Sequence, residues 1–281
     1  MNKFLHILFF VSCISFAASA QSGIFQPKEL NNGNKGIVYD REAAGDLKLF
    51  SNGFEIGLNV GRLKSYYRTQ YWHFGIGELK HHREYKNRDG ITGGNSSGRN
   101  SRSYIYGKQN NLYAVRVGYG VKRYYSEKAR KKGLAIGVSY EGGPTLGILK
   151  PYYLEINRTE IGGQVKPSPE KFNGSNANLF LNTDRIFGAA PAINGLNELK
   201  IRPGIHLMGA IHFDWGAFDE YVKAVEVGIA ADVFFSDMPI LIDDATFTNN
   251  TGSPVDILSR NVKNRPFFIN FYISFQLGKR W

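Results

Sequence analysis

The feature that most constrains this fold is an alternation of apolar residues with small or polar residues at a period of two. Because successive side chains of a β-strand point to opposite faces, this pattern predicts strands with one apolar face each. Seven such segments are clear, and an eighth, at 42–50, has a weaker apolar side. The segments span residues 42–50, 54–60, 72–76, 113–121, 134–140, 205–213, 225–235 and 267–277. We therefore expect an all-β fold.

The residues opposite the apolar face separate two all-β architectures, a soluble sandwich and a barrel in lipid. The solvent face of a sandwich is polar, whereas here the second face carries mostly Gly, Ala, Ser and Asn with a few charges of both signs. Such residues suit the interior of an eight-stranded barrel, which is just wide enough for side chains. The apolar face also ends in aromatic residues, as the girdles of membrane barrels do. These are Trp72, Tyr113, Tyr140, Phe213 and Phe267.

Composition excludes two other classes of protein. A mean hydropathy of -0.30, with no apolar run of about 18 residues after the N-terminus, excludes a helical membrane protein. A content of 42% hydrophobic and 14% aromatic residues excludes a disordered polar chain. We predict a transmembrane, antiparallel, up-and-down β-barrel of eight strands.

The lengths of the connections predict how such a barrel is oriented. The connections at 64–69, 124–132 and 215–220 are short, and those at 80–110, 151–200 and 236–264 are long. Membrane barrels have short periplasmic turns and long extracellular loops. With a periplasmic N-terminus, all three short connections fall on the periplasmic side only if the segment at 42–50 is a strand. Ser51-Asn52-Gly53 then forms a hairpin turn, because Asn-Gly tolerates positive φ.

The N-terminus has the pattern of a secretory signal peptide. Lys3 precedes a nearly continuous apolar stretch from Phe4 to Phe16, and Ala18-Ser19-Ala20 is a small-x-small cleavage site. We predict a signal peptide at 1–20, a periplasmic N-terminal extension at 21–40 and the barrel at 41–281. The single cysteine, Cys13, lies in the signal, so we expect neither a disulfide nor a cysteine-based metal site in the mature chain.

The C-terminal strand resembles the final strand of outer-membrane barrels, which ends in an aromatic residue after alternating apolar residues. The matching positions are Phe271, Ile273, Phe275, Leu277 and Trp281, with Lys279 as the exception. The resemblance implies that this strand is recognised by the barrel-assembly machinery. The span 42–281 is similar to the small barrels of the outer-membrane protein A and X type. The segments 106–108 and 142–154 resemble a family of Bacteroidetes envelope proteins, which implies the outer membrane of a Gram-negative bacterium but no activity.

Several charged residues and histidines fall on the inward face. They are Arg116, Lys122, Glu141, His206, His212, Asp214, Glu226 and Asp232, together with His73. Because buried charges persist only when paired, we expect a salt-bridged network, for example Arg116 with Glu141. A histidine oriented by a carboxylate is also a usable base. His206 and His212 lie about 20 Å apart along a strand, so they cannot share a metal. We predict no metal, cofactor or catalytic residue.

The connection between 80 and 110 carries half of the mature chain's excess positive charge. Its basic residues are Lys80, Arg83, Lys86, Arg88, Arg99, Arg102 and Lys108, against Glu84 and Asp89, giving 7 − 2 = +5. We interpret it as a solvated loop that binds the phosphates of lipopolysaccharide through charge-assisted hydrogen bonds. Nucleic acid is not the expected partner of an exported chain, despite a net charge of +11.

The leading hypothesis is a non-enzymatic surface or accessory barrel whose loops contact lipopolysaccharide or another envelope protein. Two alternatives belong to other classes. A lipid A modifying enzyme could use His81 or His82 at the outer rim with one of the nearby serines, Ser96, Ser97, Ser101 and Ser103. No motif fixes such a pair, and adjacent histidines on a strand point in opposite directions. A narrow channel for small solutes would need an open lumen.

Overall fold

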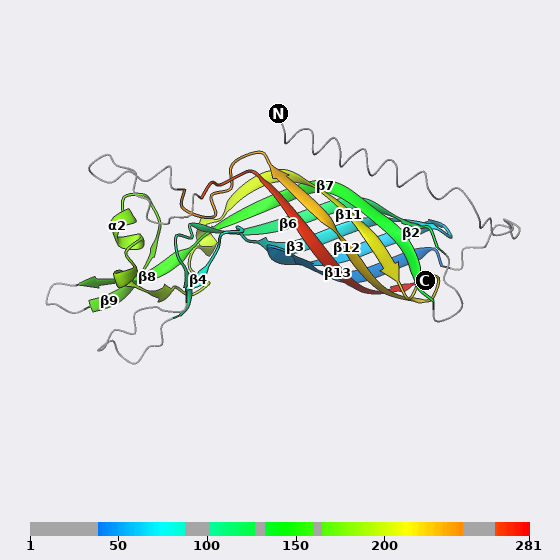
Figure 1. Ribbon diagram of the computed structural model, residues 1–281, viewed down its shortest axis with the longest axis horizontal. Coiled ribbons are helices and arrows are strands. Elements are labelled where there is room, and N and C mark those ends of the chain that lie inside the picture. Colours follow the sequence, from blue (N-terminus) through cyan, green and yellow to red (C-terminus); the bar gives the residue numbers. More distant parts are fainter. Residues whose placement is uncertain (1–38, 88–101, 127–132, 160–164, 244–261) are drawn as a thin grey trace, which may run out of the picture. The chain divides into compact units, whose positions relative to one another are not determined.

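Eight strands close into an antiparallel barrel in the computed structural model, which describes residues 39–87, 102–126, 133–159, 165–243 and 262–281 (Figure 1). Each barrel strand pairs with the next one along the chain, and the last pairs with the first. The strands are β1 (Arg41–Phe50), β2 (Gly53–Ser65), β3 (Arg68–Leu79), β6 (Asn110–Tyr124), β7 (Ala135–Pro151), β11 (Lys200–Asp214), β12 (Tyr221–Phe234) and β13 (Phe267–Arg280). The prediction of an all-β, up-and-down barrel of eight strands is confirmed.

The uncertain first strand is a full member of the barrel. It pairs with β13 from Glu42↔Arg280 to Phe50↔Tyr272, and with β2 along its whole length. Its inward side chains are buried and mostly polar, whereas Leu47 and Leu49 point outward. The apolar face is weak because Ala and Gly occupy its other outward positions.

The connections alternate in length as predicted. Residues 66–67 join β2 to β3 and residues 215–220 join β11 to β12 at one end of the barrel, where Asp40 N also donates to Trp281 O. The long connections leave from the other end, together with the tight Ser51–Asn52 turn. Gly53 follows that turn with φ 153°, and a Cβ there would lie 2.0 Å from the carbonyl oxygen of Glu78, so only glycine fits.

The connection between β7 and β11, which the sequence predicts as a long loop, folds into a small sheet. It contains β8 (Tyr153–Thr159), β9 (Val165–Lys171), β10 (Ile186–Ala189), the short helix α2 (Ala177–Phe180) and the 3₁₀ turns η1 (Thr183–Arg185) and η2 (Leu196–Glu198). Its strands pair in the order β10-β8-β9. A local apolar core holds it, formed by Tyr104, Leu154, Ile156, Phe180, Leu181, Ile186 and Ile242. We call this unit the cap.

The connection between β3 and β6 is also partly ordered. Its β4 (Lys86–Asn87) pairs with β5 (Tyr104–Ile105), and Tyr104 packs into the core of the cap. Strand β8 follows β7 after one residue, so the cap continues from the long-loop end of the barrel (Figure 1). Among the described residues, no helix is both long and apolar enough to cross a membrane.

A segment of the β12–β13 connection, 236–243, enters the barrel mouth. Met238 and Ile240 are fully buried and belong to the largest apolar cluster, with Phe50, Leu79, Leu112, Leu149 and Phe234 among its members. The backbone of the segment is held as well, because Gln109 N and Asn110 N donate to Ile240 O and Ile242 N donates to Gly107 O. We call residues 236–243 the plug.

Candidate functional site

The interior of the barrel below the plug is a buried network of charged and polar side chains. All eight predicted luminal residues, and His73, point into it and are at most 8% exposed. Five further charged residues, which the sequence analysis did not place there, join them: Glu42, Asp46, Lys48, Glu55 and Arg280.

Arg116 lies at the centre of the upper part of this network. Its Nε and Nη2 donate to the two carboxylate oxygens of Asp232 at 2.8 and 2.9 Å, and its Nη1 donates to Glu55. The predicted pairing of Arg116 with Glu141 is wrong. The register between β6 and β7 sets Arg116 opposite Thr145, which lies four residues beyond Glu141. The carboxylate of Glu141 lies 3.6 Å from Lys48 Nζ instead.

Asp46, Glu55 and His73 bring one ligand atom each within 4.8 Å of one another, which is the spacing of a metal site. The ammonium of Lys48 already lies among them. Its Nζ is 2.9 Å from Glu55 Oε1, 2.9 Å from His73 Nε2 and 3.4 Å from Asp46 Oδ2. A metal ion would have to displace this cation, so the residues present fit a lysine-centred cluster better than a metal site.

A second cluster lies near the short-turn end. Glu42 accepts from Lys122 at 3.1 Å and from Arg280 at 2.8 Å, and Arg280 Nη2 donates to Asp214 at 2.9 Å. These contacts tie β1, β6, β11 and β13 together across the lumen. The cluster therefore links strands that are not all neighbours in the wall.

His212 has the carboxylate neighbours of a general base and lies buried inside the barrel. Its Nδ1 is 2.8 Å from Glu226 Oε1, and its Nε2 is 3.2 Å from Tyr124 Oη and 3.8 Å from Asp214 Oδ2. The side chain is 1% exposed. His206 contacts Thr145 Oγ1 at 2.9 Å. The contacts of His212 therefore join β6, β11 and β12 inside the lumen.

The basic residues of the 80–110 connection have different environments. Lys80, Arg83, Lys86 and Arg102 are exposed, whereas Arg88 and Arg99 lie outside the described residues. The prediction that Lys108 belongs to a solvated, phosphate-binding loop is wrong. Lys108 is 1% exposed, donates to Glu84 at 2.8 Å and lies over the Tyr152 ring. It sits beneath the plug, where Lys108 and Leu241 form a β-bridge. Lys108 therefore does not face lipopolysaccharide.

The predicted histidine pair at the rim also departs from the strand geometry. His81 and His82 follow β3 in a turn, and their rings stack with centroids 4.4 Å apart instead of pointing in opposite directions. Strand β3 ends at Leu79, so the alternation rule does not apply to them. Of the serines considered as their partners, Ser96, Ser97 and Ser101 lie outside the described residues.

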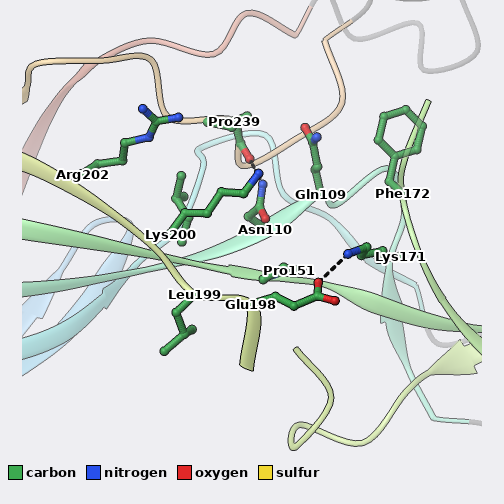
Figure 2. Close-up of a pocket in the computed structure, with 11 residues that line it drawn as sticks. Gln109, Asn110, Pro151, Lys171, Phe172, Glu198, Leu199, Lys200, Arg202 and Pro239 are labelled. Carbon is green, nitrogen blue, oxygen red and sulfur yellow. Dashed lines mark hydrogen bonds and ion pairs between the residues drawn. The ribbon is translucent and has the colours of Figure 1, made fainter. Parts of the chain in front are cut away.

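A pocket of about 420 Å³ lies between the barrel rim and the cap (Figure 2). On one side Lys171 Nζ donates to Glu198 Oε2 at 2.6 Å, and this bond raises the pKa of Lys171 and lowers that of Glu198. Lys200 and Arg202 contribute further positive charge. The remaining lining residues are Gln109, Asn110, Leu149, Pro151, Phe172, Leu199 and Pro239. With Lys171 paired to Glu198, the charge of the lining is that of Lys200 and Arg202, so it is net positive.

The strand order, closure and filled lumen define the class as a closed eight-stranded antiparallel β-barrel. Among solved structures, the chain is similar to the N-terminal β-barrel domain of Pseudomonas aeruginosa OprF, with a TM-score of 0.32 and 6% identity over 86% of this chain and 98% of that one. A TM-score this low supports no further conclusion. No protein-family model and no curated protein matches the sequence.

Proposed function

We propose that this chain is an outer-membrane β-barrel of a Gram-negative bacterium with a non-enzymatic surface or accessory role. One observation carries the proposal: the outward face of the barrel is a belt of apolar side chains, most of them exposed. Mid-strand residues that a soluble protein would bury are open, including Ile229 at 49%, Ile273 at 45% and Phe271 at 68% exposure. Exposed apolar patches on soluble monomers rarely exceed a few hundred Å², so a belt around the whole barrel supports a lipid-facing wall.

The belt has the height of a bilayer core. Outward apolar residues of β13 run from Phe267 to Leu277, and the ten residue steps between them span roughly 33 Å along the strand. At a strand tilt of about 40°, this corresponds to about 25 Å along the membrane normal, the height of the apolar band of outer-membrane barrels.

All three tryptophans lie at the short-turn end and are about half exposed. They are Trp72, Trp215 and Trp281. Trp72 also packs edge-on against Tyr119, with ring centroids 5.3 Å apart. Tryptophan favours the membrane-water interface because it combines an apolar ring with a polar N–H. These positions support a periplasmic short-turn end and an external cap.

The filled lumen favours a structural or accessory role over the two alternatives. Arg116 is fully buried between two carboxylates, and the plug closes the mouth above it with apolar side chains. A channel would need this network and the plug to move apart. A rim enzyme would need a serine nucleophile positioned beside a histidine base. Among the described residues, no hydrogen bond joins His81 or His82 to a serine, and the two rings stack on each other instead.

The predicted signal peptide at 1–20, the periplasmic extension at 21–40 and the likeness to Bacteroidetes envelope proteins complete the proposal. In this account the alternating C-terminal strand directs the chain to the barrel-assembly machinery. Its matching residues, Phe271, Ile273, Phe275, Leu277 and Trp281, all point outward. The exposed basic residues of the 80–110 connection then lie where lipopolysaccharide phosphates are, and the cap is available to another envelope protein.

Heat-modifiable migration tests the membrane assignment. The full-length protein, expressed in a Gram-negative host, should be recovered in the outer-membrane fraction. It should migrate faster unboiled than boiled on a denaturing gel, because a closed barrel resists detergent until it is heated. Recovery as a soluble periplasmic protein would contradict the proposal.

A charge-neutralised variant tests the contact with lipopolysaccharide. Changing Arg83, Arg88, Arg99 and Arg102 to Gln, with Lys86→Gln, should weaken binding of the purified protein to lipopolysaccharide, and more so at low salt. A matched variant neutralises five exposed cations near the other end of the barrel: Arg41, Arg62, Lys64, Arg68 and Lys223. This control should bind like the wild type. Equal losses of lipopolysaccharide binding in both variants would contradict a specific contact by the 80–110 connection, because net charge alone would then explain the binding.

A further inference from the structure

The barrel wall has a notch at its outer rim, because the β1–β2 hairpin is shorter than its neighbours. Strand β13 pairs with β12 from Phe267 onward, but with β1 only from Tyr272. On the other side, β3 ends at Leu79 opposite Gly53, and the chain continues into Lys80. Beyond the Ser51–Asn52 turn, the first residues of β13 therefore have no strand on their β1 side, and a pocket of about 200 Å³ lies there.

The notch is lined by cations and neutral hydrogen-bonding groups. Its full lining is Asn52, Lys80, His81, His82, Lys263, Arg265, Phe267, Phe268, Ile269 and Asn270. Lys263 and Arg265 form no ion pair with any carboxylate that the structure describes, whereas Lys80 lies 3.8 Å from Glu78, a weak exposed contact. Three fixed positive charges thus line one small pocket, and only Lys80 has a carboxylate within ion-pair distance among the described residues.

The nearest carboxylate on the inner side is already engaged. Glu84 accepts from Lys108 Nζ at 2.8 Å and from the backbone N–H of His81 at 3.0 Å. It neutralises the buried Lys108 and fixes the turn that carries the histidines. The charge of the notch is therefore available to a ligand.

The same notch opens onto the apolar belt. Phe267 and Ile269 line it and also form the outer end of the belt, at 45% and 63% exposure. The guanidinium of Arg265 lies 5.7 Å from the centroid of the Phe267 ring, so charge and apolar surface meet within one side-chain contact. A free anion would use only the polar half of this surface.

We infer that the notch binds one membrane lipid with a phosphorylated headgroup. The phosphate would contact Lys80, Lys263 and Arg265 by charge-assisted hydrogen bonds, and an acyl chain would lie along Phe267 and Ile269. The inference rests on the proposed membrane location, and it adds a defined site formed by residues on both sides of the β1–β2 hairpin. Two of its three cations lie in the β12–β13 connection, outside the basic 80–110 segment.

Native mass spectrometry of the full-length protein in detergent tests the site directly. We expect one tightly held phosphatidylglycerol, and weaker retention of a diacylglycerol with the same acyl chains, which lacks the phosphate. Glycerol phosphate, which lacks the acyl chains, should bind at least about tenfold more weakly than phosphatidylglycerol. Binding of glycerol phosphate as tight as that of the lipid would overturn the inference in favour of a free-phosphate site.

Two variants assign the site to these residues. The triple change Lys80→Gln, Lys263→Gln and Arg265→Gln should lower phosphatidylglycerol affinity at least about tenfold, because each lost charge removes a charge-assisted bond. A control variant removes three exposed cations of the cap: Arg158, Lys166 and Arg185. It should bind normally. An unchanged affinity in the triple variant, or an equal loss in the control, would overturn the inference.

The apolar half of the site has its own test. Ile269→Ser should weaken phosphatidylglycerol binding while leaving glycerol phosphate binding unchanged, and no effect on the lipid would contradict the acyl-chain contact. Heat-modifiable migration of each variant reports separately on the barrel. A wild-type chain that bound phosphatidylglycerol but failed to enter membranes would retain the site and overturn only the proposed function.

Discussion

At the residue scale, the barrel depends on Arg116. Replacing one member of a buried ion pair leaves the partner charge uncompensated, which costs about 3–5 kcal/mol. Arg116→Met should lower the free energy of unfolding by about this amount, since Asp232 loses its cation and Glu55 keeps only Lys48. Urea titration of the heat-modifiable form measures it. Arg185→Met, at an exposed site in the cap, is the matched control and should change stability by less than about 0.5 kcal/mol.

A compensating variant separates lost charge from lost packing. Adding Asp232→Asn to Arg116→Met removes the uncompensated carboxylate and should recover part of the stability, while Glu55 stays paired with Lys48. If the double variant were as unstable as the single one, the shape of the arginine side chain rather than its charge would be what the lumen requires.

The notch histidines give a pH prediction. Burial lowers the pKa of His81 and His82, and the charges of Arg83 and Arg265 lower that of His82 further, while Glu84 partly offsets the shift at His81. A lowered pKa keeps both rings neutral at neutral pH and delays protonation to acid pH. Phosphatidylglycerol affinity should therefore rise as the pH falls below about 6.5, the ordinary histidine pKa, because each added proton faces a phosphodiester whose charge stays constant.

The pH profile of a double His81→Gln, His82→Gln variant is the control for this prediction. Its phosphatidylglycerol affinity should be flat over the same interval, with the fixed charges of Lys80, Lys263 and Arg265 still present. A rise of equal size in the variant would assign the pH dependence to other groups.

The sequence predicted which residues face the lumen better than it predicted their partners. Alternation fixes the face of a side chain, so Arg116 and Glu141 were both placed inside correctly. The partner depends on the stagger between strands, which a single sequence does not reveal. Asp46 and Lys48 were missed because their strand has a weak apolar face, although the same alternation from Leu47 and Leu49 identifies them as inward.

At the element scale, the plug is the part of the fold with the sharpest consequence. Ile240→Asp would bury a carboxylate in the apolar layer beneath the cap, which is unfavourable without a partner. The segment 236–243 should then detach, and its backbone amides should exchange with deuterium much faster than in the wild type. Ile193→Asp, on an exposed apolar side chain of the cap, is the control. Slow exchange in the Ile240 variant would show that the plug is held by its backbone bonds alone.

The cap shows where sequence patterns stop being informative. Strand β10 has only four residues, and β9 contains Pro167 and Pro169, which argue against a strand in a single sequence. The core of the cap joins residues from three separate connections, including Tyr104, Ile156 and Ile242. Such a core is set by tertiary contacts between distant segments, so local alternation predicts the barrel strands but not the cap.

At the scale of the whole molecule, a sealed lumen predicts the absence of conduction. The wild-type protein should show no stable conductance in planar bilayers, because the charged network and the plug fill the interior. Ile240→Asp alone should not produce a channel, since the ion pairs of Arg116 remain below the plug. Stable conductance in the wild type would instead support the small-solute channel.

The central claim is that the apolar belt across the middle of the barrel strands faces lipid. Spin labels on cysteines introduced one at a time at the outward positions of β12, from Tyr221 to Val233, test it without background, because Cys13 lies in the predicted signal. In reconstituted bilayers, collision with oxygen should peak near Ile229 and fall toward both ends, while collision with a water-soluble nickel chelate should show the opposite profile. High nickel accessibility at Ile229, or protection from both reagents along the whole strand, would contradict a membrane-spanning barrel.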